Sequence, residues 1–103
     1  MARHLVEIRF DAAKRQIFCL PHKLIVKRRD SIAWRCATDQ PFTVDFGWDS
    51  PLPEISYSVE AKRGMTVSVP EDAPEGRYEY FVALFDPITG LVYTFDPDMI
   101  IRR

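Results

Sequence analysis

Residues 74–84 read Pro-Glu-Gly-Arg-Tyr-Glu-Tyr-Phe-Val-Ala-Leu, and this stretch decides the class of fold. The Pro and the Gly favour a turn, and apolar side chains then recur at every second position from Tyr78 to Leu84. From Phe81 onward, the positions between them are apolar as well. Because both faces are apolar there, we expect residues 78–85 to form a strand at the centre of a sheet.

A hairpin should follow this strand. The segment 86–90, Asp-Pro-Ile-Thr-Gly, has turn residues at both ends, because Pro presets φ and Gly tolerates positive φ. Apolar residues return over 91–95, so the sequence predicts a hairpin over residues 79–95.

The rest of the chain alternates in the same way and shows no sustained helical period. The inward positions of the expected strands are Val6, Ile8 and Phe10; Leu24 and Val26; Ile32, Trp34 and Cys36; and Met65, Val67 and Val69. Short strands are also expected over 43–46 and 99–101, and a single helical turn near 11–15. Two prolines make 50–53 a loop. Seven or eight short strands with regular turns predict one all-β domain over residues 1–103, a Greek-key β-sandwich.

Three segments carry a resemblance to a known family. The stretch from Leu24 to Trp34 has a turn followed by a hydrophobic-x-Trp strand, residues 41–44 read Pro-Phe-Thr-Val, and residues 73–80 form a turn that leads into an aromatic strand. In their order and spacing they resemble the cupredoxins (plastocyanin and azurin type), small β-sandwiches that usually hold one copper ion. The resemblance covers about residues 5–103, with Arg29 where the family has a Gly in the first turn.

The resemblance implies that the copper ligands are missing. The first His position corresponds to Phe42, the Cys position falls near Val82, and the loop that should supply a second His and a Met contains neither over 83–95. A blue-copper site needs two imidazoles, a thiolate and a weak axial ligand, so we expect no copper and no other cofactor. One alternative is a relocated metal site on Cys19 and His22, although metal sites usually need three or four protein ligands.

The chain has two cysteines, Cys19 and Cys36, and the sequence leaves open whether they pair. No run of about 18 apolar residues is present, so no membrane span is expected. The first residues also lack the apolar stretch of a signal peptide. If Met1 is the native start, we expect a cytoplasmic protein in which both cysteines are thiols.

No catalytic constellation is visible, so we expect no enzyme activity. Nothing would orient a Cys–His pair, and the four glycines form no phosphate loop. Basic residues are concentrated at the start, since residues 1–35 carry nine Lys/Arg and three Asp/Glu. They are spread over several expected strands and no RNA-binding aromatic motif accompanies them, so local neutralisation is favoured over nucleic-acid binding.

The remaining candidate is an apolar binding patch. Phe42 and the hairpin shoulder, Phe85, Pro87 and Ile88, should lie at the end where cupredoxins hold copper, and Trp48 precedes a Pro-rich loop. If exposed, these side chains indicate a protein partner or a second copy; if buried, Phe42 plugs the vacated metal pocket and Trp48 packs under its loop. The sequence thus predicts a non-catalytic, copper-free module for protein interaction or self-association. The further alternative is a small ligand such as a carbohydrate, bound by Trp48 and nearby acids.

Overall fold

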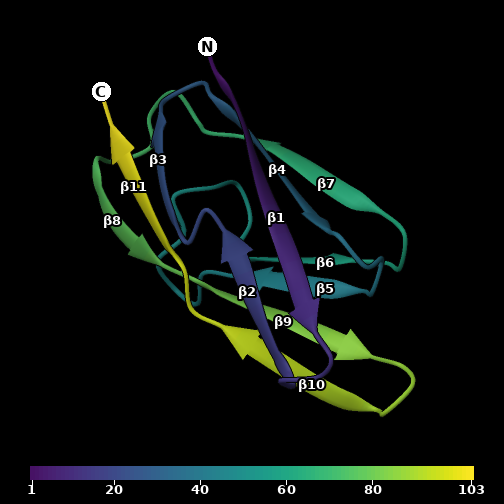
Figure 1. The fold of residues 1–103 in the computed structure, drawn as a ribbon. Coiled ribbons are helices and arrows are strands. Elements are labelled where there is room, and N and C mark those ends of the chain that lie inside the picture. Colours follow the sequence, from purple (N-terminus) through teal and green to yellow (C-terminus); the bar gives the residue numbers. More distant parts are fainter.

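The computed structural model describes all residues, 1–103, as an all-β molecule of eleven strands (Figure 1). The strands are β1 (Arg3–Asp11), β2 (Gln16–Leu20), β3 (Lys23–Lys27), β4 (Ser31–Cys36), β5 (Phe42–Asp45), β6 (Ser56–Val59), β7 (Gly64–Ser68), β8 (Gly76–Glu79), β9 (Phe81–Asp86), β10 (Leu91–Phe95) and β11 (Asp98–Arg102). No helix long and apolar enough to cross a membrane is present. The expected fold class is confirmed, with more strands than the seven or eight expected.

The strands form three sheets. Their orders are β2-β1-β4-β7, β10-β9-β5-β6 and β3-β11-β8. β1 runs parallel to β4 and β3 runs parallel to β11, whereas the other pairs are antiparallel. One core cluster of 21 buried residues draws on all three sheets, with Trp34 fully buried within it.

Residues 78–85 do not stay in one sheet. β8 pairs with β11, whereas β9, which begins after Tyr80, pairs with β5 and β10. Inward positions continue without interruption through Tyr78, Tyr80 and Val82, all of which are buried. The alternation therefore predicts the strand but contains no sign of the change of sheet.

Two strands, β2 and β6, were not expected, and the strand expected over 78–85 is divided into β8 and β9. β6 is short and carries Ser56 and Ser58 on its exposed side, so it lacks a clear apolar period. The helical turn expected near 11–15 is wrong. These residues connect β1 to β2 as a hairpin turn, with Asp11 Oδ1 accepting a hydrogen bond from the Lys14 N–H at 3.1 Å. The hairpin expected over 79–95 is confirmed, with Asp86 opposite Leu91.

In the turn between β3 and β4, Arg29 occupies the position at which the resemblance places a Gly, and its backbone has a conformation typical of Gly. Arg29 adopts a φ of 72°, a left-handed conformation that Gly adopts without strain. The next residue, Asp30, is buried and accepts hydrogen bonds from the N–H groups of Ala2 and Lys27. This carboxylate therefore fastens the start of β1 to the turn.

Cys19 and Cys36 cannot form a disulfide. Both lie opposite Ile8, Cys19 on β2 and Cys36 on β4, with β1 between them. Neighbouring strands lie about 4.8 Å apart, so the two Cα atoms are separated by roughly twice that distance. A disulfide requires Cα atoms within about 7 Å. Both residues are free thiols in the core.

Candidate functional site

The outer surface of the sheet β10-β9-β5-β6 carries an apolar row. Phe81, Ala83 and Phe85 point outward from β9, because they alternate with Val82 and Leu84, which are fully buried. β9 lies between β10 and β5, so its expected place inside a sheet is confirmed, but its outer face is only partly covered. Phe81 is 38% exposed and Phe85 43% exposed.

Neighbouring strands extend this row in register. Asp45 lies beside Phe81, Thr43 lies beside Ala83, and Val92 lies beside Phe85. We call this surface the β9 face and define it by Thr43, Asp45, Phe81, Ala83, Phe85, Val92 and Thr94. Its centre carries the small side chains of Thr43, Ala83 and Thr94, and Phe81 and Phe85 lie toward its two ends.

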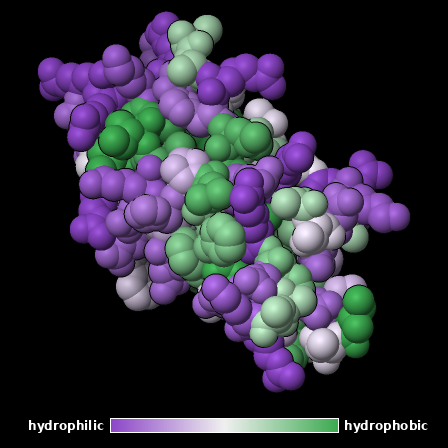
Figure 2. Space-filling view, in the orientation of Figure 1, coloured by the Kyte–Doolittle hydropathy of each residue, from purple (hydrophilic) through white to green (hydrophobic).

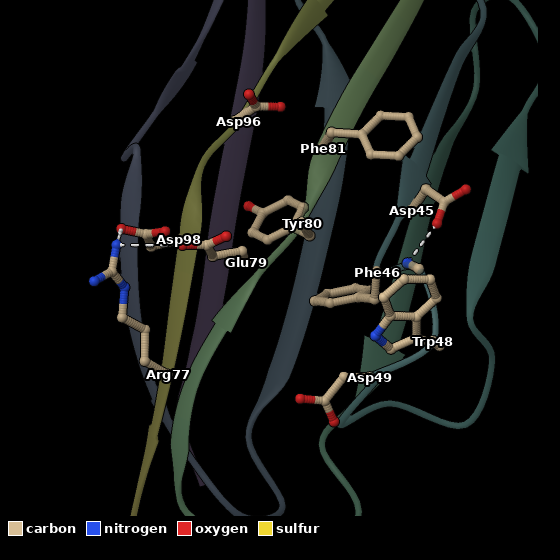
Figure 3. A pocket seen from close by; sticks show the side chains of 11 residues that line it. Asp45, Phe46, Trp48, Asp49, Arg77, Glu79, Tyr80, Phe81, Asp96 and Asp98 are labelled. Atoms are coloured by element: carbon tan, nitrogen blue, oxygen red, sulfur yellow. Dashed lines mark hydrogen bonds and ion pairs between the residues drawn. The ribbon is translucent and has the colours of Figure 1, made fainter.

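A depression of about 850 Å³ lies at the Phe81 end of the β9 face (Figure 3). Phe46 and Tyr80 form its apolar floor, with ring centroids 4.9 Å apart. Trp48 stands at one wall and is 96% exposed. This volume falls within the range of ordinary ligand pockets. We call it the Trp48 depression.

Local contacts fix the floor and the tryptophan wall. Tyr80 is buried, its hydroxyl accepts a hydrogen bond from Trp34 Nε1 at 3.4 Å, and burial raises its pKa. On the other side Asp45 Oδ1 accepts a hydrogen bond from the Gly47 N–H at 2.6 Å, and Gly47 has a φ of 66°. This tight turn projects Trp48 away from the core, so the tryptophan does not pack under its loop.

The remaining walls are acidic. Five carboxylates and one guanidinium line the Trp48 depression: Asp45, Asp49, Glu79, Asp96, Asp98 and Arg77. Arg77 lies across from Trp48 and donates to Asp98 Oδ2 at 2.9 Å (Figure 3). The lining therefore carries an excess of negative charge beside an exposed indole, a combination that suits cations and hydrogen-bond donors.

A smaller hollow of about 460 Å³ lies at the other end of the β9 face. Phe85 and Val92 are among the residues that line it, together with Pro41 and Phe42. Phe42 itself is only 3% exposed, because it is part of the core cluster and lies between Leu84 and Val59 in register. Phe42 is thus a filled core position at the bottom of the hollow.

The hairpin tip forms a separate apolar point. Ile88 is 92% exposed, and Pro87 is also exposed. The buried Asp86 shapes the turn by accepting hydrogen bonds from the Ile88 N–H and the Thr89 hydroxyl. Figure 2 shows an apolar group at the end of the β9–β10 hairpin, apart from those over β3, β1 and β2. The five side chains expected in one patch are therefore distributed over the hollow, the hairpin tip and the Trp48 depression.

Comparison with known proteins identifies the fold. A pseudoazurin from Sinorhizobium meliloti matches over 100% of this chain and 76% of its own, with a TM-score of 0.61 and 16% identity. A pseudoazurin from Methylobacterium extorquens matches over 96% and 74%, with a TM-score of 0.58 and 14% identity. The fold is that of a cupredoxin.

Other comparisons agree with this fold or find nothing. A variant of amicyanin in its reduced Cu(I) form matches 97% of this chain and 82% of its own, with a TM-score of 0.56 and 14% identity. No protein-family model matches the sequence, and no curated protein matches it. At these identities the likeness establishes a cupredoxin-like fold and leaves function to the residues themselves.

Two positions that the sequence resemblance assigns to copper ligands are apolar in this chain. Phe42 lies beside Leu84, and Val82 lies beside Val44, with all four side chains buried. None of the four offers a ligand atom that copper prefers. No group of three or more His, Cys, Asp or Glu residues lies close enough to hold a metal ion.

The alternative Cys19–His22 pair does not converge in this cupredoxin fold. Cys19 is 1% exposed, and burial raises its pKa to about 12, so it is held as a neutral thiol. His22 is exposed in the connection between β2 and β3. The other histidine, His4, is engaged with Asp30, its Nε2 lying 2.8 Å from Oδ2. Cys36 is also buried and lies on the far side of β1 from Cys19.

Sequence reasoning missed Phe81 and Val92 as surface residues and missed the acidic walls of the Trp48 depression. Phe81 and Val92 lie in strongly apolar strands, and a continuous apolar pattern predicts burial on both faces. The walls come from β5, β8, β11 and the connections 47–49 and 96–97, which lie far apart in sequence. A sequence shows that such acids exist but not that the chain brings them together.

Proposed function

We propose that this chain is a non-catalytic, copper-free cupredoxin-like module that binds a partner protein through the β9 face. The observation that carries the proposal is the outward row of Phe81, Ala83 and Phe85, extended by Val92, on a surface that no other part of the chain covers. Aromatic residues are enriched in protein interfaces, and exposed apolar groups that lie together usually mark a partner site.

The non-catalytic part rests on the state of the reactive groups. Both thiols are buried, and the raised pKa of Cys19 opposes thiolate formation. The carboxylates of the Trp48 depression have no nucleophile or histidine among the residues that line it with them. The arrangement supports binding and provides no group in position for acyl transfer or proton transfer by histidine.

A photocrosslinking experiment tests the proposed face. A benzophenone amino acid is placed at Val92, which is 61% exposed, and in a second protein at Ile25, which is 44% exposed on β3 and belongs to a different surface. Both proteins are expressed in the cells that normally make this chain, and adducts are identified by mass spectrometry. We expect a discrete protein adduct from position 92 and none from position 25.

The partner found in this way gives the quantitative test. Phe85→Ser should weaken its binding at least about tenfold, as expected when a large aromatic contact residue is truncated, while Ile25→Ser leaves the affinity unchanged. Adducts of equal yield from both positions, or none from position 92, would contradict the assignment of the β9 face.

A second candidate function is supported by the Trp48 depression. An exposed indole beside several carboxylates can stack on a sugar ring while the acids accept hydrogen bonds from its hydroxyls. Trp34 is fully buried, so Trp48 is the tryptophan that solvent and ligands can reach. A saturable change in its fluorescence with neutral oligosaccharides, lost in Trp48→Ala, would support carbohydrate binding. A flat response would remove this candidate.

A further inference from the structure

The β7 edge of the first sheet is open and uncharged. β7 (Gly64–Ser68) pairs with β4 on one side and with nothing on the other. Its five residues, Gly-Met-Thr-Val-Ser, include neither a charged residue nor a proline. An exposed edge without such residues is a template for pairing with another strand.

The other sheet edges differ from β7. β2 and β10 lie against each other, so each covers the other's edge. β3 carries Lys23 and Lys27 at its two ends, and β8 includes Arg77 and Glu79. β6 is free and uncharged within the strand, but Glu54 and Glu60 flank it. Charged residues at an edge are a common protection against unwanted pairing. β7 contains none, and the charges that flank it are of opposite sign at its two ends, whereas those that flank β6 are both negative.

The hydrogen-bonding groups that β7 offers can be assigned by alternation. The Val69 N–H donates to the carbonyl of Asp30 on the β4 side at 2.8 Å. In an antiparallel pair, successive residues direct their backbone groups to opposite sides, so Met65 and Val67 also face β4. The N–H and C=O groups of Gly64, Thr66 and Ser68 therefore point away from the sheet.

The charges that flank β7 favour an antiparallel second copy. Lys62 and Arg63 precede the strand, and Glu71 and Asp72 follow it after Pro70. Antiparallel pairing of two identical strands brings the basic end of one copy to the acidic end of the other, twice by symmetry. The same pairing through β6 would bring Glu54 near Glu60 of the other copy, which is repulsive.

We propose that the chain forms a twofold-symmetric dimer by antiparallel pairing of β7 with β7 of a second copy. Thr66 lies opposite Thr66 of the second copy, and Gly64 lies opposite Ser68. The two first sheets join into one sheet of eight strands, and the half-buried Met65 and Val67 gain cover at the join. The β7 edge is distinct from the β9 face, so dimerisation through β7 and partner binding through the β9 face can be tested independently.

A charge-exchange experiment tests both the edge and the register. Thr66 is exposed, and its side chain would meet its own copy across the twofold axis. Thr66→Lys and Thr66→Glu should therefore each weaken self-association by about fivefold or more, because like charges directly opposite each other repel. An equimolar mixture of the two variants should recover the dimer as a heterodimer. Sedimentation velocity gives the masses, and circular dichroism confirms that each variant folds.

Matched controls use the free edge of β6. Ser58→Lys occupies the corresponding outward position on that strand and should leave self-association unchanged. Thr66→Pro removes the outward N–H of β7 without touching the ladder to β4, and should abolish the dimer. Phe85→Ser, which tests the β9 face, should dimerise like the unchanged protein.

Amide hydrogen exchange provides a readout without substitution. The amides of Gly64, Thr66 and Ser68 should become protected as protein concentration rises, whereas those of Ser56 and Ser58 should not. A monomer at about 100 μM, or a Thr66→Lys protein that dimerises as well as the unchanged protein, would overturn the proposal. If the two substitutions weakened the dimer only by disturbing the fold, mixing the two variants would not restore it.

Discussion

At the scale of single residues, Asp30 shows how one buried carboxylate organises the fold. It is 5% exposed and accepts hydrogen bonds from the N–H of Ala2 at 2.8 Å and of Lys27 at 3.0 Å. The side chain of His4 also contacts this carboxylate, with Nε2 of His4 lying 2.8 Å from Oδ2 of Asp30. Burial alone would raise the pKa of Asp30, but the bonds from His4, Ala2 and Lys27 together with the positive charge of His4 lower it to about 2.

This pKa predicts a defined acid sensitivity. Because the carboxyl titrates near 3.8 when unfolded and near 2 when folded, its contribution is fully present above about pH 4 and is lost as the pH falls toward 2. The shift corresponds to about 2 kcal/mol. Urea unfolding of Asp30→Asn should show a free energy lower by about 2 to 3 kcal/mol at pH 7 and a weaker dependence on pH below 4.

Asp72→Asn is the matched control for this prediction. Asp72 is exposed, so its removal should leave the unfolding free energy within about 0.5 kcal/mol at either pH. Equal pH profiles for Asp30→Asn and the unchanged protein would show that Asp30 does not carry the acid sensitivity.

At the scale of elements, the sequence reveals strands more readily than their partners. The alternation in 32–36 and 65–69 identifies β4 and β7 correctly, because one face of each strand packs on the core. The same rule fails to show that β8 and β9 belong to different sheets, since both sheets require inward side chains at the same positions. It places β9 correctly inside a sheet but does not show that the apolar residues on the outer side of β9 are partly exposed to solvent.

Phe42 and Trp48 provide a contrast between a filled core position and a surface side chain. Phe42→Ala should lower the free energy of unfolding by about 3 to 5 kcal/mol, because it removes a ring packed among core residues. Trp48→Ala should change it by less than about 0.5 kcal/mol, since Trp48 is 96% exposed. Both values come from urea unfolding followed by circular dichroism. Similar losses for both variants would mean that Trp48 packs on its loop.

At the scale of the whole molecule, the sequence predicts the cupredoxin-like fold better than the binding surface. The fold follows from turn residues and apolar periods that are local in the chain. The Trp48 depression forms where segments that are distant in the sequence meet around the stacked rings of Phe46 and Tyr80. The sequence therefore shows that acidic residues are present but not which of them line the depression. That Phe42 and Val82 cannot serve as copper ligands follows from the sequence alone, because only certain side chains carry a ligand atom.

A fold of this kind does not determine function, and the chemistry of the site must decide it. In this chain the two positions that the resemblance assigns to copper ligands, Phe42 and Val82, are packed with apolar side chains, while an aromatic row points outward from the opposite face of the same sheet. These features are the basis on which we propose that the scaffold serves recognition rather than electron transfer.

Whether the chain retains copper is the first measurement to make. Reduced protein is titrated with Cu(I) and, separately, with Cu(II), and the metal that remains after desalting is measured per chain. We expect no stoichiometric copper to be retained. One tightly held equivalent, lost in Cys19→Ser or His22→Ala, would show that the protein is not copper-free and would point to metal handling.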